Sequence, residues 1–171
     1  VKAVDGISIV MPALVDDGQN DALVFKIVSV FPHNPQVGLP TIHAAVLVLE
    51  TYSGRPLAML EGGTLTAIRT GAASGAATDL PARRDSKTAA IFGAGIQSRT
   101  QLEAICAVRP IESVFVYDVD PQRAHTFIEH QVQLEDQTMA FSAASSPKDA
   151  IESADIICTA TTSKTPVFPD E

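Results

Sequence analysis

A glycine turn between two short apolar runs most constrains what this chain can fold into. Residues 87–92 form an apolar run that enters a Gly-Ala-Gly turn at 93–95, and the next residues, 96–108, have helical spacing. A second apolar run, 113–118, follows and ends on an acid. Strand, glycine turn, helix, strand and acid is the order that a dinucleotide-binding unit requires. The sequence therefore predicts that this region binds a nicotinamide or flavin dinucleotide.

Each position of the turn has a physical role in this prediction. Gly93 permits the tight turn and Gly95 lets the backbone approach a pyrophosphate, while the N-terminus of the following helix offers free N–H donors and a partial positive charge. Ser98 stands where a third glycine is usual, and serine is small enough for close contact between helix and strand. Asp118 would accept hydrogen bonds from both ribose hydroxyls but repel a 2′-phosphate, so NAD is favoured over NADP as the cofactor.

Two nearby charges also bear on the choice of coenzyme. Arg123 falls in the first turn of the next predicted helix and could swing toward a phosphate, although we favour a solvated surface arginine. Asp120 adds a second negative charge near the predicted pocket. Because like charges repel, Asp120 strengthens the preference for NAD.

Composition and charge exclude several classes of protein. The formal net charge of -8 and the pI near 4.9 argue against a nucleic-acid surface. No apolar run is long enough to cross a bilayer, and no signal segment opens the chain. Cys106 and Cys158 lie in apolar runs, where we expect buried thiols, and His33 and His43 have no partner at metal-ligand spacing. We expect a soluble, cytoplasmic protein with no metal site.

The pattern of elements changes near Asp85. After it, apolar runs and helical segments alternate, as in half of a doubly wound parallel sheet. We therefore predict an α/β fold in which part of a Rossmann-type sheet, residues 86–171, is preceded by part of an α+β domain, residues 1–85. Before Asp85, strands without helices between them, typical of an antiparallel or mixed sheet, are predicted at 7–14, 22–31, 42–50 and 56–60.

The predicted parallel strands locate one further set of candidate residues. Right-handed crossovers bring the carboxyl ends of parallel strands to one edge of the sheet, where a ligand lies. The strand predicted at 155–160 ends at this edge, so Thr159, Ala160 and Thr161 are candidate cofactor-binding residues.

A helix rich in small residues is predicted at 64–82, with Thr64 or Thr66 as its N-cap. Its interior contains Gly71 and Gly75, which weaken an isolated helix. Both glycines are tolerable if that face packs very closely on a neighbouring element.

Two cations and one hydroxyl are candidates for chemistry. Lys26 lies in a predicted apolar strand, where a charge is costly without a partner. Its ammonium either binds an anion or, if the strand is at the edge of the sheet, extends into water, and both interpretations stay open. Arg69, in the small-residue helix, suits a substrate carboxylate, although a structural ion pair is slightly favoured on the residues alone. Thr41 could offer its hydroxyl to a cofactor or only begin a strand.

Four strings in this order resemble the ornithine cyclodeaminase/mu-crystallin family. They are FKIVSVFPHNP at 25–35, LTAIRTGAASG at 65–75, IFGAGIQ at 91–97 and ADIICTATT at 154–162. The resemblance covers nearly the whole chain, and four ordered motifs are far more specific than the glycine turn alone.

The resemblance implies a homodimer whose substrate and dimerisation domain is formed by both ends of the chain, around a central Rossmann domain. It also implies roles for individual residues. Lys26 and Arg69 match substrate residues, the arginine gripping a carboxylate, and Thr41 matches a threonine near the nicotinamide. Family contacts to the cofactor match Ile96, Gln97, Asp118 and Thr159.

The activity implied by the resemblance is NAD(H)-dependent hydride transfer at the alpha carbon of a small amino acid. Ornithine cyclodeamination to proline and ammonia is the leading expectation. Alanine dehydrogenation, reduction of a ketimine or pyrroline carboxylate, a non-catalytic binding protein and an inactive truncated relative are the alternatives. The aspartate that acts as general acid/base in the family is expected beyond Glu171, so we expect this chain to be a fragment without turnover of its own.

Overall fold

The computed structural model describes residues 1–3, 5–16, 18, 21–134 and 139–168. The chain divides into two compact units, Val1–Thr66 and Ala67–Glu171. This division falls inside helix α1 (Gly62–Asp79). The domain boundary near residue 85 stays a prediction.

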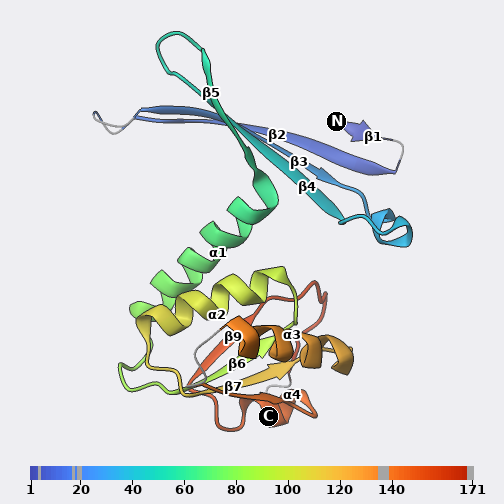
Figure 1. Ribbon diagram of the computed structural model, residues 1–171, viewed down its shortest axis with the longest axis vertical. Coiled ribbons are helices and arrows are strands. Elements are labelled where there is room, and N and C mark those ends of the chain that lie inside the picture. Colours follow the sequence, from blue (N-terminus) through green and yellow to red (C-terminus); the bar gives the residue numbers. More distant parts are fainter. Residues whose placement is uncertain (4, 17, 19–20, 135–138, 169–171) are drawn as a thin grey trace. The chain divides into compact units, whose positions relative to one another are not determined.

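The first unit contains a single antiparallel sheet. Its strands are β1 (Lys2–Ala3), β2 (Gly6–Val15), β3 (Ala22–Val30), β4 (Ile42–Leu49) and β5 (Pro56–Glu61). Strands that follow one another in the chain are neighbours in the sheet, so the order is β1-β2-β3-β4-β5 (Figure 1). A short 3-10 helix, η1 (Asn34–Val37), precedes β4. The prediction of an antiparallel or mixed sheet in this segment is confirmed.

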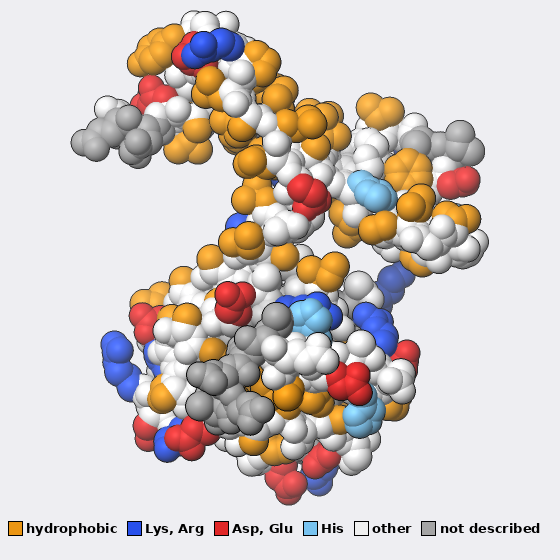
Figure 2. All heavy atoms as spheres, viewed as in Figure 1, with side chains coloured by type: hydrophobic (Ala, Val, Ile, Leu, Met, Phe, Trp, Pro, Cys, Tyr) orange, Lys and Arg blue, Asp and Glu red, His pale blue; other side chains and the backbone are white. Residues whose placement is uncertain are grey.

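Much of the apolar surface of this sheet is exposed. On β2, Ile7 is 48% exposed, Val10 is 55% and Leu14 is 63%, and these residues come from both faces of the strand. Val46 of β4, at 6%, is the one hydrophobic residue in the described part of the unit that is buried. In Figure 2, hydrophobic side chains, coloured orange, cover much of the visible surface of this sheet. Contiguous apolar surface of this kind is typical of an interaction face.

The second unit contains a parallel sheet with helices between its strands. Its elements after α1 are β6 (Thr88–Phe92), α2 (Ile96–Val108), β7 (Ser113–Tyr117), α3 (Pro121–Leu134), β8 (Ala140–Ala143), α4 (Pro147–Ile151) and β9 (Ile156–Thr159). The strand order β8-β7-β6-β9 is that of a Rossmann-type half sheet, which confirms the predicted fold class. The sequence also predicts a short strand at 138–141, and the first of these residues lies outside the described part of the chain.

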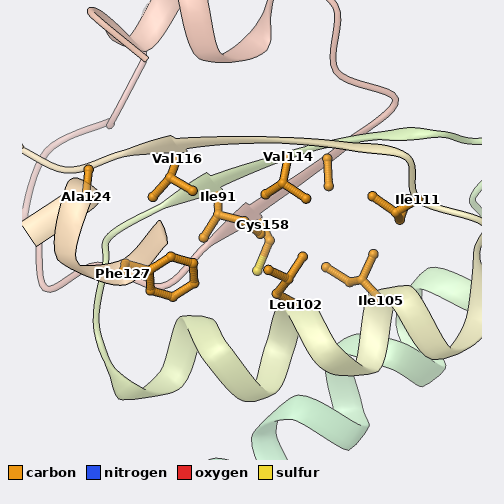
Figure 3. Packing of buried hydrophobic residues seen from close by; sticks show 10 residues of the cluster. Ile91, Leu102, Ile105, Ile111, Val114, Val116, Ala124, Phe127 and Cys158 are labelled. Atoms are coloured by element: carbon orange, nitrogen blue, oxygen red, sulfur yellow. The ribbon is translucent and has the colours of Figure 1, made fainter. Parts of the chain in front are cut away.

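The core of the second unit lies on both faces of its sheet. Alternate residues of a strand point to opposite faces, so Ile91 of β6 faces α2 and α3 while Phe92 faces α4. Leu102 of α2 and Phe127 of α3 pack with Ile91 in the larger cluster (Figure 3). Ala150 of α4 packs with Phe92 on the opposite face. This packing fixes the carboxyl end of β6, where the glycine turn begins.

The start of α1 corrects one prediction. The helix begins at Gly62, and its first N–H groups are capped by the carboxylate of Glu61 rather than by Thr64 or Thr66. Glu61 accepts hydrogen bonds from the backbone N–H of Gly63 and of Thr64, each at 2.6 Å. These bonds, led by the one from Thr64, lower the pKa of the Glu61 carboxyl.

The glycines of α1 lie against α2, and this close packing meets the condition under which the sequence analysis found them tolerable. A Cβ atom built on Gly71 would lie 2.7 Å from the carbonyl carbon of Thr100, and one on Gly75 would lie 3.0 Å from Cβ of Ala104. The hydroxyl of Thr100 also donates to the carbonyl oxygen of Ala67 at 2.9 Å. The small residues therefore allow close contact between the two helix backbones.

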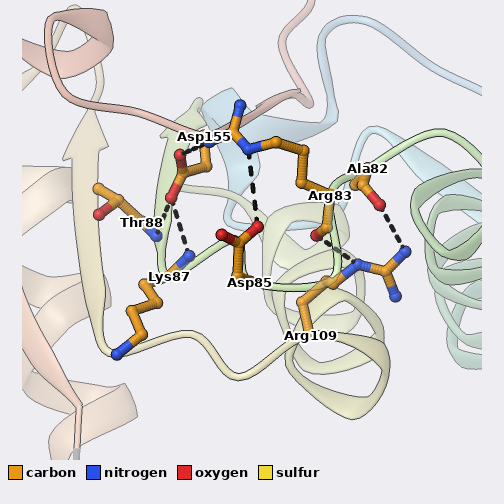
Figure 4. A network of polar contacts seen from close by, with 7 residues as sticks. All are labelled: Ala82, Arg83, Asp85, Lys87, Thr88, Arg109 and Asp155. Atoms are coloured by element: carbon orange, nitrogen blue, oxygen red, sulfur yellow. Dashed lines mark hydrogen bonds and ion pairs between the residues drawn. The ribbon is translucent and has the colours of Figure 1, made fainter.

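Polar contacts hold the end of α1 and the start of the parallel sheet (Figure 4). Arg109, 3% exposed, donates to the Asp79 carboxylate at 2.8 Å and to the carbonyl oxygen of Ala82 at 2.8 Å. The carboxylate of Asp155 accepts hydrogen bonds from the backbone N–H of Lys87 at 2.8 Å and of Thr88 at 3.1 Å. These two bonds lower the pKa of Asp155.

Candidate functional site

The glycine turn leaves β6 in a conformation that only glycine adopts without strain. Gly93 has φ of 91°, and a Cβ atom built on it would lie 2.6 Å from the carbonyl oxygen of Ala160. Its N–H donates to the carbonyl oxygen of Tyr117 at 2.8 Å, so the turn is tied to the end of the neighbouring strand β7. Gly93 therefore fits the tight-turn role that the sequence predicted.

Gly95 differs from Gly93 because nothing in the described protein crowds it. A Cβ atom there would meet no atom of the described residues within 4 Å, and its φ of −100° is one that any residue adopts. It is the N-cap of α2, and no side chain among the described residues caps that helix end. Protein packing therefore does not require a glycine at this position. A ligand that approaches the N-terminus of α2 would require one.

Ser98 supports the turn from inside the protein. It is fully buried, and its hydroxyl donates to the carbonyl oxygen of Gly93. The sequence prediction grouped Ser98 with the cofactor contacts. In the structure its side chain contacts the turn itself.

Asp118 is joined to the turn by its carboxylate. One oxygen, Oδ2, accepts the backbone N–H of Ala94 at 2.8 Å, and the other, Oδ1, accepts the backbone N–H of Asp120 at 3.0 Å. Ala94 stands between the two glycines of the turn. These hydrogen bonds fix the orientation of Asp118 at the carboxyl end of β7, the position from which an acid binds a ribose in Rossmann folds.

A groove of about 690 Å³ runs along this edge of the sheet. The groove has the size of a site for a small organic ligand. Its wall contains most of the predicted cofactor residues: Gly93, Gly95, Ile96, Gln97, Asp118, Ala160 and Thr161. Ile96 is 72% exposed, which leaves its apolar side chain available to a ligand. Of the cofactor residues predicted in the second unit, Ser98 and Thr159 are not part of the groove wall.

Sequence reasoning missed a segment that forms another part of the groove wall. Residues beyond β9, among them Ser163 and the run 165–167, line the groove. Phe168 holds this segment against the sheet, because its ring centroid lies 5.3 Å from that of Phe92. No apolar periodicity marks this stretch, so the sequence did not predict that it packs against the sheet.

Lys26 and Thr41 belong to the first unit. Lys26 lies in β3, which pairs with β2 and β4, so the interpretation of an edge-strand lysine is wrong. Its ammonium donates to the hydroxyl of Thr66 at 2.8 Å. Thr41 is half-buried just before β4, and its carbonyl oxygen accepts the N–H of Phe31 at 2.8 Å.

Arg69 belongs to the second unit, on α1, and its side chain is exposed. Within the described residues its guanidinium makes no ion pair or hydrogen bond, so the structural ion pair considered for it is not found there. An exposed, unpaired guanidinium is available to an anionic ligand.

The remaining candidate groups carry no evident chemistry. Burial raises the pKa of the Cys158 thiol to about 11, which makes this cysteine a poor nucleophile at neutral pH. Cys106 is half-buried rather than buried as predicted. No group of three or more His, Cys, Asp or Glu residues suited to a metal ion occurs in the described residues. Within the same residues, none of the helices combines the length and apolarity needed to span a bilayer.

The parallel sheet, the glycine turn and the acid at the end of β7 place the second unit in the Rossmann class of folds. The chain belongs to the ornithine cyclodeaminase/mu-crystallin family, whose model matches residues 1–171. The family resemblance carried by the four sequence motifs is therefore confirmed.

Individual relatives match nearly all of this chain. A Delta(1)-pyrroline-2-carboxylate reductase of Bacillus cereus is 41% identical over 164 residues, which are 95% of this chain and 49% of that protein. An L-lysine cyclodeaminase of Streptomyces rapamycinicus is 37% identical over 153 residues, 87% of this chain and 43% of that protein. The solved structure of Thermococcus litoralis Delta(1)-pyrroline-2-carboxylate reductase with NADH and L-proline has a TM-score of 0.80 and 38% identity, covering 94% of this chain and 54% of that chain. The chain spans about half the length of the curated relatives that it matches.

Proposed function

We propose that this chain is part of an NAD(H)-dependent enzyme that reduces the C=N bond of a small cyclic imino acid such as Delta(1)-pyrroline-2-carboxylate. The observation that carries the proposal is the open space over Gly95 beside an Asp118 already joined to the turn. The likeness to reductases of this substrate supports reduction over the other reactions of the family.

The groove residues suit an extended dinucleotide. The N–H groups at the start of α2, which no described side chain caps, would bind the pyrophosphate over Gly95, and Asp118 would accept hydrogen bonds from the ribose hydroxyls. Ile96, Gln97, Thr159, Ala160 and Thr161 would hold the remainder of the coenzyme, with Thr41 near the nicotinamide. Ser98 would act indirectly, by holding the carbonyl of Gly93. When bound, a reduced nicotinamide supplies the hydride for the imine carbon.

Two cationic side chains are proposed to bind the substrate. Arg69 would pair with the substrate carboxylate, and Lys26 would contribute a second positive charge to substrate binding. Reduction adds the hydride to the imine carbon and a proton to the nitrogen, which gives the cyclic amino acid. The proton donor we expect is the family aspartate beyond Glu171. Holding the substrate carboxylate orients the C=N bond and supplies much of the rate.

Cyclodeamination is the second candidate function, and the 37% identity to an L-lysine cyclodeaminase supports it. Ornithine cyclodeamination, the leading expectation from sequence, belongs to this class. A cyclodeaminase returns the hydride that it removes, so it releases ammonia without net consumption of coenzyme. A reductase consumes one NADH for each amino acid formed.

Activity assays of the full-length protein that contains this chain would distinguish these functions. With NADH and Delta(1)-pyrroline-2-carboxylate, the proposal expects loss of NADH absorbance that matches L-proline formed. Ammonia from L-ornithine or L-lysine without net NADH change would select the cyclodeaminase, and net NADH formation from L-alanine a dehydrogenase. Binding of NADH without turnover of any substrate would select a binding protein. Arg69→Ala should raise the KM for the imino acid strongly, whereas Arg84→Ala, at an exposed arginine with no proposed substrate role, should not.

We also propose a cytoplasmic homodimer. The exposed apolar surface of the first sheet supports it, because a second copy of the chain could cover that surface. Sedimentation of the full-length protein at micromolar concentration should give the mass of two chains.

A further inference from the structure

Gln101 is a buried polar residue of α2, with 8% of its surface exposed, and it is not part of the groove wall. A buried amide is costly unless it is hydrogen-bonded, so the partners of this side chain indicate its role. Its carbonyl oxygen, Oε1, accepts a hydrogen bond from the hydroxyl of Ser74 on α1 at 3.0 Å. The same oxygen accepts a second one from the thiol of Cys158 on β9, also at 3.0 Å. A single amide oxygen of α2 therefore joins α1 to β9.

The contact with Cys158 lies close to the strand end that borders the groove. Figure 3 shows the side chain of Cys158 directed from the sheet toward α2. Burial raises the pKa of this thiol to about 11, so at neutral pH it keeps the proton that it donates to Gln101. Two residues further along the chain, Ala160 lines the groove, and its N–H donates to the carbonyl oxygen of Phe92 at 2.8 Å. Gln101 thus fixes α2 to the strand that leads into the groove wall.

The contact with Ser74 lies on the helix that carries Arg69. Ser74 follows Arg69 by about one and a half turns of α1, and both residues belong to the second unit. Close packing of Gly71 and Gly75 on α2 holds the two helices together, but packing of small residues has no strict direction. A hydrogen bond has a narrow range of distance and angle. The bond from Ser74 to Gln101 therefore restricts sliding of α1, and with it of Arg69, along α2.

We propose that Gln101 is a positioning residue, which fixes the substrate arginine on α1 relative to the coenzyme groove at the end of β9. This inference rests on the proposed function, because it takes Arg69 as the substrate residue and the groove as the coenzyme site. Loss of the amide would leave both binding groups in place and change only their relative position. A misplacement of about 1 Å can cost about 100-fold in rate. The effect should therefore fall on hydride transfer and not on binding.

Stopped-flow measurement of NADH oxidation in a single turnover with Delta(1)-pyrroline-2-carboxylate tests this role in the full-length protein. Gln101→Met keeps the length of the side chain but removes the shared acceptor. We expect the rate of hydride transfer to fall about tenfold or more, while the dissociation constant for NADH and the KM for the imino acid stay within about threefold. Ile105→Val, a change in the apolar core of the same helix, should lower the melting temperature and leave this rate within about twofold of the wild type.

The two hydrogen bonds can also be removed one at a time, which keeps the test decisive if Gln101→Met does not fold. Ser74→Ala and Cys158→Ala should each slow hydride transfer, whereas Ser74→Thr keeps the hydroxyl and should retain the wild-type rate. The double variant Ser74→Ala/Gln101→Met should be no slower than Gln101→Met, because both changes break the same contact.

An active wild type whose rate is unchanged by Ser74→Ala and Cys158→Ala would overturn the inference and leave the proposed function intact. A loss of rate that follows melting temperature across all the variants, Ile105→Val included, would also overturn it, since Gln101 would then only stabilise the fold. A wild type that binds NADH but does not reduce the imino acid would overturn the proposed function, and this inference with it.

Discussion

The carboxylate of Asp118 accepts a hydrogen bond of 2.8 Å from the backbone N–H of Ala94, which lies between the two glycines of the turn. The acid that ends β7 is thereby joined to the loop that ends β6. A ligand whose ribose meets Asp118 and whose pyrophosphate meets Gly95 would contact two elements that the protein already holds together. This preorganisation reduces the entropy lost on binding.

Asp118→Ala should weaken NAD⁺ much more than NADP⁺. The variant loses the acceptor for the ribose hydroxyls, and a hydrogen bond to a charged group contributes about 1.5–3 kcal/mol, but it also removes the charge that repels a 2′-phosphate. Fluorescence titration with both reduced coenzymes measures the two affinities. Glu103→Ala, at an exposed carboxylate outside the groove wall, is the matched control and should change the affinities little. Equal weakening of both coenzymes by Asp118→Ala would count against the ribose role.

Gly93→Ala should destabilise the protein and abolish coenzyme binding together. Alanine at φ of 91° is strained, and its Cβ would lie 2.6 Å from the carbonyl oxygen of Ala160. This oxygen belongs to the backbone, so no side-chain rotation can relieve the clash. We expect a loss of roughly 1–3 kcal/mol, visible as a lower melting temperature. A Gly93→Ala protein that melts with the wild type would show that the turn is not held as described.

Gly71→Ala should destabilise α1, although alanine is the better helix former. Intrinsic propensity favours alanine by roughly 1 kcal/mol, but the new Cβ would lie 2.7 Å from the carbonyl carbon of Thr100 and separate α1 from α2. Overpacking of this kind costs about 1–3 kcal/mol, so the net effect should be a loss in a urea titration. Ala76→Gly on the exposed side of α1 calibrates propensity alone and should cost about 1 kcal/mol. A gain in stability from Gly71→Ala would contradict the close packing.

Asp155→Ala should lower stability at neutral pH, and the difference should shrink in acid. Hydrogen bonds from the backbone N–H of Lys87 and of Thr88 hold the pKa of Asp155 below the ordinary value of an aspartate. A carboxyl with a lowered folded-state pKa stabilises the fold above its unfolded pKa, and this contribution is lost as pH falls through the folded value. Melting temperatures of both proteins from pH 7 to about pH 3 should therefore converge at the low end. A difference that is constant with pH would assign the effect to packing.

The sequence predicted the second unit well because its determinants are local. Apolar runs, a Gly-Ala-Gly turn and a terminal acid lie close together in the chain, and the pairing of β6 with β7 follows from their connection. Close packing of the small-residue face of α1 could likewise be inferred from the sequence, since glycines within a helix are tolerated where the helix packs closely on a neighbour. Lys26 was ambiguous on sequence, because only the pairing of β3 on both sides excludes an edge strand.

Features that depend on partners distant in sequence were not predictable. Arg109 is buried because its guanidinium donates hydrogen bonds to the carbonyl oxygens of residues 82 and 83, just after the end of α1. No local sequence pattern predicts this contact. The groove wall beyond β9 depends on the contact of Phe168 with Phe92. The sequence predicted a threonine cap for α1 because threonine is a preferred N-cap residue. In the structure the carboxylate of Glu61 accepts the hydrogen bonds from the first N–H groups of the helix.

We expect the pyrophosphate of the coenzyme to lie over Gly95, and a single substitution tests this placement. A Cβ at this position meets no described protein atom within 4 Å, so Gly95→Ala should fold with the melting temperature of the wild type. The same methyl group would occupy the space that the pyrophosphate needs. Calorimetric titration of NADH into the full-length protein should give clear binding for the wild type and a loss of about tenfold or more for Gly95→Ala. Equal affinity of the two proteins for NADH would contradict the account.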